Sequence, residues 1–123
     1  LEMTTAPYIT VLENLHLPER FLEKIKKDIE YIIKSNLNSL EFIVLFGSCA
    51  NGKLKVTSDI DLLIITNDRL DQVVRGDIAA ELAEPVKSVA TDAIFYTVEE
   101  LKIGKSLFLK QVMKEGIVIW KKD

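Results

Sequence analysis

Two aspartates stand two residues apart at the start of an apolar segment. Asp59 and Asp61 belong to residues 59–66 (DIDLLIIT), in which the residues after Asp61 are apolar up to a final threonine. Such a run predicts a buried strand, and side chains two apart on a strand point to the same face. Two carboxylates this close repel each other and are costly to bury without a counter-charge. The spacing therefore predicts a cation site, and oxygen ligands favour Mg²⁺, which usually takes one or two carboxylates together with substrate phosphates.

A third aspartate is the one charged residue of another apolar segment. Asp92 lies within residues 88–97 (SVATDAIFYT), a further predicted strand. A neighbouring strand could place it beside Asp59 and Asp61 and complete a cluster of three carboxylates. This cluster suits phosphoryl transfer with two Mg²⁺ ions, of which one holds a triphosphate and the other activates an acceptor hydroxyl. All three are therefore candidate metal ligands and catalytic residues; surface acids at strand ends are the alternative interpretation.

A glycine and a serine directly follow the first predicted strand. Gly47 allows a tight turn and the close approach of a phosphate. Exposed backbone N–H groups at such a turn, with the Ser48 hydroxyl, can hold phosphate oxygens, although Ser48 could instead only cap a helix. In the loop that follows, Lys53 and Lys55 are candidates for further phosphate contacts or are solvated lysines, and Ser58 is a candidate ligand or a structural hydrogen-bonding residue.

The pattern around these residues alternates helices and strands. Helices are predicted at residues 17–36, 69–83 and 98–115, and strands at 41–46, 59–66, 88–97 and 117–120. We expect one domain over residues 1–123 with an α/β (α+β) fold, in which helices pack on a β-sheet.

Helical spacing divides the residues of the long helices between core and surface. In the first helix Lys24, Lys26, Lys27 and Asp28 are assigned to the solvent face. The core stripe of the last helix is predicted to contain Leu101, Phe108, Leu109, Val112 and Met113. Three further apolar residues lie off these stripes and form either scattered surface contacts or a partner surface: Tyr31, Ile103 and Leu107.

Composition excludes several classes of protein. Hydrophobic residues make up 48% and charged residues 28% of the chain, which is ordinary for a globular protein. The formal net charge of −3 argues against extended nucleic-acid binding, which usually requires a basic excess. The single cysteine, Cys49, leaves no intramolecular disulfide and favours a reducing, cytoplasmic location. No apolar run reaches the roughly 18 residues that a membrane span needs, so no membrane association is expected.

The combined motif resembles a known family. Gly47-Ser48, ten intervening residues and Asp59-Ile60-Asp61, set between two apolar strands, are similar to the signature of the nucleotidyltransferase superfamily with the DNA polymerase β-like palm, and within it to the minimal nucleotidyltransferases (MNT). Asp92 lies where the family's third carboxylate would be expected. The resemblance implies a palm-like fold with a mixed β-sheet flanked by helices. It also implies Mg²⁺ as cofactor, ATP or another NTP as donor, and transfer of AMP to an acceptor.

The resemblance also implies a partner and leaves alternatives open. Short members of the family often pair with a small helical protein of the HEPN type in toxin–antitoxin systems, where the antitoxin adenylylates or blocks the toxin. Many relatives carry basic residues where this chain has Cys49 and Asn51, which leaves a catalytically weak antitoxin that acts by contact as a second hypothesis. A small-molecule (antibiotic) adenylyltransferase is a third. A minimal domain leaves its site open on one side, so a HEPN-type partner or a homodimer is expected to complete it.

Overall fold

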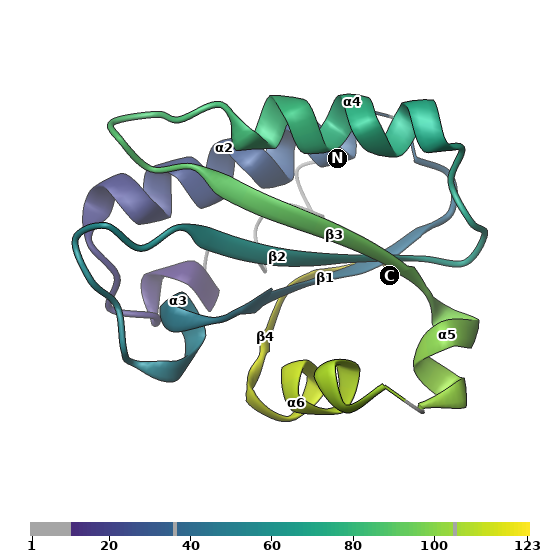
Figure 1. The fold of residues 1–123 in the computed structure, drawn as a ribbon. Helices are drawn as coiled ribbons and strands as arrows, with labels where there is room; N and C mark the ends of the chain where they lie inside the picture. Colours follow the sequence, from purple (N-terminus) through teal and green to yellow (C-terminus); the bar gives the residue numbers. More distant parts are fainter. Residues whose placement is uncertain (1–10, 36, 105) are drawn as a thin grey trace.

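The computed structural model describes residues 11–35, 37–104 and 106–123, and in this part of the chain the strands form a single sheet (Figure 1). The order across the sheet is β3-β2-β1-β4. In chain order the strands are β1 (Leu40–Phe46), β2 (Ile60–Thr66), β3 (Thr91–Thr97) and β4 (Ile117–Lys121).

Strand direction is mixed, as the family resemblance implies. β1 runs antiparallel to both β2 and β4, whereas β2 and β3 run parallel. A parallel pair requires a long crossover connection, and α4 (Gln72–Ala83) provides it. β2 is an interior strand whose side chains are buried except that of Asp61, which is partly buried. Asp61 therefore lies near the start of the strand, where its carboxylate is partly accessible.

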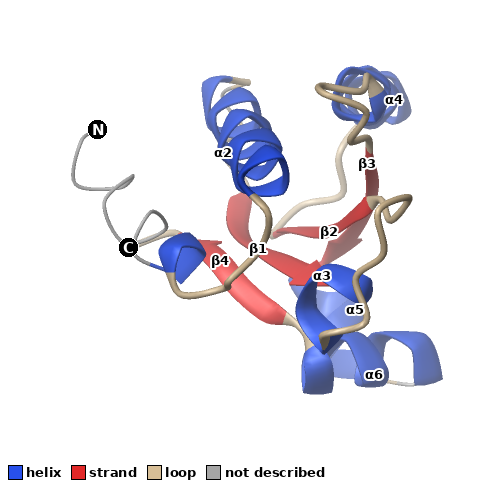
Figure 2. Cartoon of the chain, turned by 90° about the vertical axis from the view of Figure 1, so that its left-hand side faces the viewer, coloured by secondary structure: helices blue, strands red, loops and turns tan. Residues whose placement is uncertain are grey.

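Helices cover both faces of the sheet (Figures 1 and 2). α2 (Glu19–Lys34) lies beside α4 on one face, and α5 (Val98–Ile103) and α6 (Leu107–Glu115) lie on the other. The short helix α3 (Ser48–Asn51) sits at the end of the sheet, between β1 and β2. Alternate side chains of β2 serve the two layers, because Leu62 packs in the cluster with α2 and α4, whereas Leu63 packs in the cluster with α6.

The prediction of a single helix over residues 98–115 is wrong. The structure divides residues 98–115 into α5 and α6 at Gly104, which has a φ of 60°, a conformation that favours glycine. Ser106 then caps α6, since its Oγ accepts a hydrogen bond from Leu109 N at 3.2 Å. The break rotates the second half of the predicted stripe, and Phe108 and Met113, expected in the core, are exposed.

The assignment of the outer face of α2 is wrong at two positions. Lys24 and Asp28, predicted to face solvent, are 2% and 3% exposed. Both residues belong to a single stripe at helical spacing, and the prediction places them on the wrong face because they are charged. The buried residues of α2 are Phe21, Lys24, Ile25, Asp28, Ile29 and Ile32. Lys26 is partly buried and Lys27 is exposed, closer to the prediction.

The apolar residues off the stripes are exposed, as expected. Tyr31, Ile103 and Leu107 have 36%, 59% and 81% of their surface exposed. Tyr31 belongs to α2 and the other two to the α5–α6 segment on the opposite side of the sheet, so the three do not form one surface. Among the helices of the described residues, none is long and apolar enough to cross a membrane.

Candidate functional site

The sheet brings two of the three predicted carboxylates together. In the pairing of β2 with β3, Asp61 lies directly opposite Asp92, and in the pairing of β2 with β1 it lies opposite Phe46. Opposed residues on neighbouring strands point to the same face. The two aspartates therefore stand side by side on the face of the sheet that carries α5 and α6, at the end where β2 and β3 begin.

The third carboxylate lies just outside the sheet. β2 begins at Ile60, so Asp59 precedes the strand rather than sharing a strand face with Asp61. Asp59 and Asp92 are exposed, whereas Asp61 is partly buried. The Asp59 backbone carbonyl lies 3.8 Å from the Cys49 sulfur, a thiol donor, and this contact holds the start of β2 against α3.

The surroundings of Asp61 disfavour a negative charge on its carboxyl group. Burial, together with the charges of Asp92 and then Asp59, raises the pKa of Asp61 to about 6. A carboxyl group with so raised a pKa is stabilised by binding either a proton or a cation. The local field therefore depends on all three predicted aspartates, with Asp61 at their centre.

Gly47 lies directly against the Asp61 carboxylate. It has a φ of 71° and a ψ of −153°, and a Cβ atom built on it would stand 2.2 Å from Asp61 Oδ2. Only glycine combines this backbone conformation with this close approach. Ser48 begins α3 immediately afterwards, and the first N–H groups of a helix have no acceptor within the helix. The predicted phosphate-binding turn and Asp61 are thus adjacent in space as well as linked by the motif.

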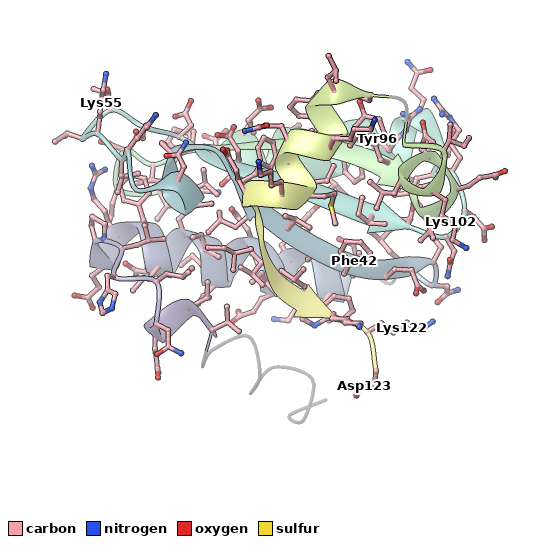
Figure 3. The ribbon with its side chains drawn as sticks, turned by 90° about the horizontal axis from the view of Figure 1, so that it is seen from below. Phe42, Lys55, Tyr96, Lys102, Lys122 and Asp123 are labelled. Atoms are coloured by element: carbon pink, nitrogen blue, oxygen red, sulfur yellow. The ribbon has the colours of Figure 1, made fainter. Side chains whose placement is uncertain are left out.

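The loop between α3 and β2 is held by specific hydrogen bonds. Ser58 Oγ accepts a hydrogen bond from Lys55 N at 2.8 Å, and Ser58 N donates to Lys55 O at 3.0 Å. Arg20, on α2, donates through Nη2 to Val56 O at 2.9 Å and anchors the loop to the helix layer. Ser58 therefore has a structural hydrogen bond in this conformation. Lys53 and Lys55 are exposed, and Figure 3 shows Lys55 projecting from the loop at the edge of the molecule.

The residues that depart from the basic pattern of the family have local roles. Cys49 is 5% exposed, and burial, followed by the charge of Asp61, raises the pKa of its thiol to about 11. A thiol with this pKa is protonated at neutral pH and is a poor nucleophile. Asn51 accepts a hydrogen bond from Lys53 N at 3.0 Å and shapes the turn after α3.

The carboxylates offer a partial rather than a closed set of metal ligands. Across residues 11–35, 37–104 and 106–123, no three His, Cys, Asp or Glu side chains converge as a complete metal site would require. Mg²⁺ rarely uses an all-protein cage and completes its octahedral shell with water and substrate phosphates. The donor atoms, the mutual charge of the aspartates and the adjacent glycine turn fit this ion. Asp61 and Asp92 are the pair that could hold it, and Asp59 lies within electrostatic reach.

A buried polar cluster next to the site was not foreseen from the sequence. Lys24 Nζ donates to Asp28 Oδ1 at 2.5 Å, to Leu82 O at 2.8 Å and to Thr91 Oγ1 at 3.1 Å, and Thr91 also donates to Asp28. Burial raises the pKa of Asp28 despite these hydrogen bonds. The cluster joins α2, the end of α4 and the first residue of β3, immediately before Asp92. The spacing of four residues between Lys24 and Asp28 was the available signal, because residues four apart on a helix are neighbours.

Comparison with known proteins identifies relatives of this arrangement. A sequence model described as "Polymerase beta, Nucleotidyltransferase" matches residues 23–123. Among curated proteins, the chain is 29% identical over 89 residues to "Protein adenylyltransferase MntA" of Shewanella oneidensis, a match that covers 72% of this chain and 60% of that protein. The chain thus spans less than two thirds of the length of this relative.

Two solved structures show the same fold. One is a putative nucleotidyltransferase from Sulfolobus solfataricus, with a TM-score of 0.60, 22% identity and coverage of 94% of this chain and 88% of that chain. The other is the complex of a tri-AMPylated HEPN toxin with an MNT antitoxin from Shewanella oneidensis. It gives a TM-score of 0.50 and 27% identity, and the match covers 79% of this chain and 72% of the chain that it aligns with. The mixed sheet with its flanking helices is therefore the nucleotidyltransferase fold that the sequence motif predicts.

Proposed function

Because the chain belongs to the polymerase beta nucleotidyltransferase family, we propose that it transfers AMP from Mg-ATP to a hydroxyl group on a partner protein. The observation that carries the proposal is the pairing of Asp61 with Asp92 across β2 and β3, with Gly47 against the Asp61 carboxylate. In the reaction, the acceptor oxygen forms a bond to the α-phosphorus of ATP, the bond to pyrophosphate breaks and the acceptor loses its proton.

Each part of the site has a role in this proposal. Asp59, Asp61 and Asp92 would hold Mg²⁺, which supplies charge neutralisation on the triphosphate and activation of the acceptor hydroxyl. Gly47 and Ser48 bind the triphosphate through the turn before α3, and Lys53 adds positive charge from the following loop. Ser58 supports this loop through its bonds with Lys55.

The positions of the strands support a proposal for the two sides of the site. Asp61 lies on an interior strand beside the glycine turn, so this side receives the nucleotide. Asp92 lies on the edge strand and is exposed, so the acceptor approaches from this side. Asp92 therefore contacts the acceptor end of the reaction and orients its hydroxyl, in addition to binding metal.

A HEPN-type protein is the partner that we propose as acceptor. The relative named above is described as a protein adenylyltransferase, and the second structure contains an AMPylated HEPN toxin bound to an MNT antitoxin. The open edge on the Asp92 side leaves access for a macromolecular acceptor. A homodimer that completes the site remains the alternative assembly.

A contact-only antitoxin is the second candidate function. It is favoured by Cys49 and Asn51, which stand where many relatives carry basic residues that would contact phosphate. In this case the chain would bind and neutralise its partner without modifying it, and the aspartates would not be needed.

One variant separates the two functions. We would measure the intact mass of the partner that co-purifies from the native host, before and after Mg-ATP, with the wild type and with Asp61→Asn. Transfer predicts a mass gain of one or more AMP units that Asp61→Asn abolishes while circular dichroism shows a folded protein. Asp77→Asn, which removes an exposed charge from α4, is the matched control and should retain transfer. A gain that persists in Asp61→Asn would exclude the assigned site, and neutralisation without any gain would favour the contact-only function.

A further inference from the structure

The outer edge of β3 lacks the features that usually prevent further strand pairing. β3 pairs with β2 over Thr91–Thr97 without a register shift, and within residues 11–35, 37–104 and 106–123 it is the last strand on its side of the sheet. After Asp92 it contains no charged residue and no proline. The opposite edge differs, because β4 has an irregularity in its pairing with β1 and ends in Lys121. Irregular pairing and edge lysines discourage the addition of a strand, so β3 is the edge open to one.

The backbone of β3 has donors directed outward. Ile60 N donates to Ala90 O at 2.9 Å, which sets the phase of the parallel ladder. Thr97 N donates a hydrogen bond to Glu100 Oε1 at 2.9 Å, so this N–H group points away from β2. In a regular parallel ladder alternate residues turn toward the same neighbour. The N–H groups of Ala93 and Phe95 therefore share the outward direction of Thr97 N.

A groove runs along this edge between β3 and α4. It has a volume of about 470 Å³ and is lined by four consecutive β3 residues, 93–96, and by residues of α4 that include Gly76 and Ala79. The small α4 side chains leave room beside the strand. The groove continues into a second cavity of about 180 Å³ toward Thr97 and Arg69, and Figure 3 shows Tyr96, which lines both, near α5.

The groove contains an unsatisfied cationic group. Arg75 lines both cavities, and its Nε is buried without a hydrogen-bond partner among the described residues. A buried donor without an acceptor is unfavourable, and a guanidinium binds carboxylates through paired, charge-assisted hydrogen bonds. The adjoining cavity is lined by Arg69 and by Glu100, whose Oε1 accepts hydrogen bonds from Thr97. An occupant with a carboxylate would satisfy this end of the groove.

We propose that an extended segment of the partner protein adds to the edge of β3 as a further strand, with its acceptor hydroxyl opposite Asp92 and an acidic side chain against Arg75. The proposal rests on the proposed function, because it assigns the route by which the acceptor reaches the carboxylates. Backbone pairing with Ala93 and Phe95 supplies binding, and the two side chains supply selectivity.

Strand geometry sets the spacing between these two side chains. A residue opposite Asp92 points to the same face as Asp92 and Asp61. Phe95 packs in the cluster of α2 and α4, on the other face, where Arg75 reaches the groove from α4. Phe95 is three positions from Asp92, and an odd separation changes face. The acidic residue of the segment is therefore three residues from the hydroxyl, on the C-terminal side if the strands are parallel and on the N-terminal side if they are antiparallel.

Synthetic peptides test the docking directly. The probes are peptides of about ten alternating valine and threonine residues that carry one tyrosine and a glutamate three residues before or after it, each with a glutamine twin. We expect one of the two glutamate peptides to bind roughly fivefold or more tightly than its twin, as for a charge-assisted hydrogen bond. Arg75→Gln should remove this difference and leave Mg-ATP binding unchanged. Equal binding of both twins to the wild type would overturn the proposal.

Edge variants test the backbone pairing. Ala93→Pro removes an outward N–H, a change that edge strands tolerate, whereas Ala93→Val keeps it at similar size. Ala93→Pro should lose peptide binding and Ala93→Val should retain it, with the fold of both checked by circular dichroism. Amide hydrogen exchange at Ala93 and Phe95 should slow when the peptide binds to the wild type, which tests pairing even if Ala93→Pro does not fold. Unchanged exchange, or equal binding by two folded variants, would overturn the pairing.

Two further outcomes separate the docking from the chemistry and from self-association. Peptide binding as described, without AMP transfer from Mg-ATP to the peptide or to the native partner, would support the docking and count against the proposed function. Transfer to the native partner that is as fast in Arg75→Gln and Ala93→Pro as in the wild type would overturn the docking alone. A dimer in sedimentation experiments that Ala93→Pro dissociates would assign the edge to a second copy and overturn the partner strand.

Discussion

Replacing Gly47 by alanine tests whether the position of the Asp61 carboxylate matters. The new Cβ would lie 2.2 Å from Asp61 Oδ2, whereas ordinary contacts begin at 3.4 Å. The carboxylate must therefore move by about 1.2 Å, the difference between these two distances. A displacement of about 1 Å in a catalytic site can reduce the rate by roughly 10²-fold. We expect Gly47→Ala to lose AMP transfer by about this factor.

Backbone strain contributes a separate loss of stability. A residue with a Cβ in the conformation of Gly47, φ 71° and ψ −153°, costs about 1–3 kcal/mol. Gly52 is the matched control, since it has a φ of 78° but no atom within 4 Å of a built Cβ. Gly52→Ala should cost about 1–2 kcal/mol for its left-handed backbone without moving Asp61.

Two assays distinguish these contributions. Urea denaturation measures the free energy of unfolding of both variants, and intact mass spectrometry of the partner measures the initial rate of AMP transfer. We expect a stability loss in both variants and a large rate loss in Gly47→Ala alone. If Gly47→Ala transfers AMP as fast as Gly52→Ala, the observed position of Asp61 is not required and the site is wrongly assigned.

Two further perturbations follow from the buried and partly buried charges. The pKa of Asp61 is raised from 3.8 to about 6. Protonation of Asp61 therefore contributes fully to the free energy of unfolding below about pH 4, and this contribution is lost as the pH rises through 6. After allowance for solvent screening, Asp61→Asn should therefore have a free energy of unfolding about 1–2 kcal/mol higher than that of the metal-free wild type at neutral pH. Urea titrations that find the same difference between the two proteins from about pH 4 to 8 would contradict this. Lys24→Met leaves Asp28 buried without its cation and should lower the free energy of unfolding by about 3–5 kcal/mol. The exposed control Lys27→Met should change it by less than about 0.5 kcal/mol, and equal losses in the two variants would show that the ion pair is not important.

The strand–turn–strand motif could be predicted because its signals are local. The apolar runs before Gly47 and after Asp61 indicate buried strands, and the observed β1 and β2 contain them. The glycine and the two aspartates stand at the strand ends, where a polar group can reach solvent or a ligand. These residues therefore identified the family before any contact was known, and the family match is consistent with them.

Other features depend on how the elements pack. The sequence around Asp92 indicates a strand, but its alignment with Asp61 requires the crossover through α4 and the parallel register of β2 and β3. Helical spacing puts Lys24 and Asp28 on the buried face of α2, but the hydrogen-bond partners that make their burial possible, Leu82 O and Thr91 Oγ1, come from distant parts of the chain.

The sequence by itself thus determined the chemistry that is available: three carboxylates, a glycine turn and the apolar strands that carry them. The tertiary structure decided which groups meet. It places Asp61 against Gly47 and opposite Asp92 and leaves Asp59 just outside the strand. Among the described residues, it also leaves the outer edge of β3 without a neighbouring strand. The physical reason is that local patterns record whether a side chain is buried or exposed, whereas contacts between distant residues depend on strand register and on which helices cover each face.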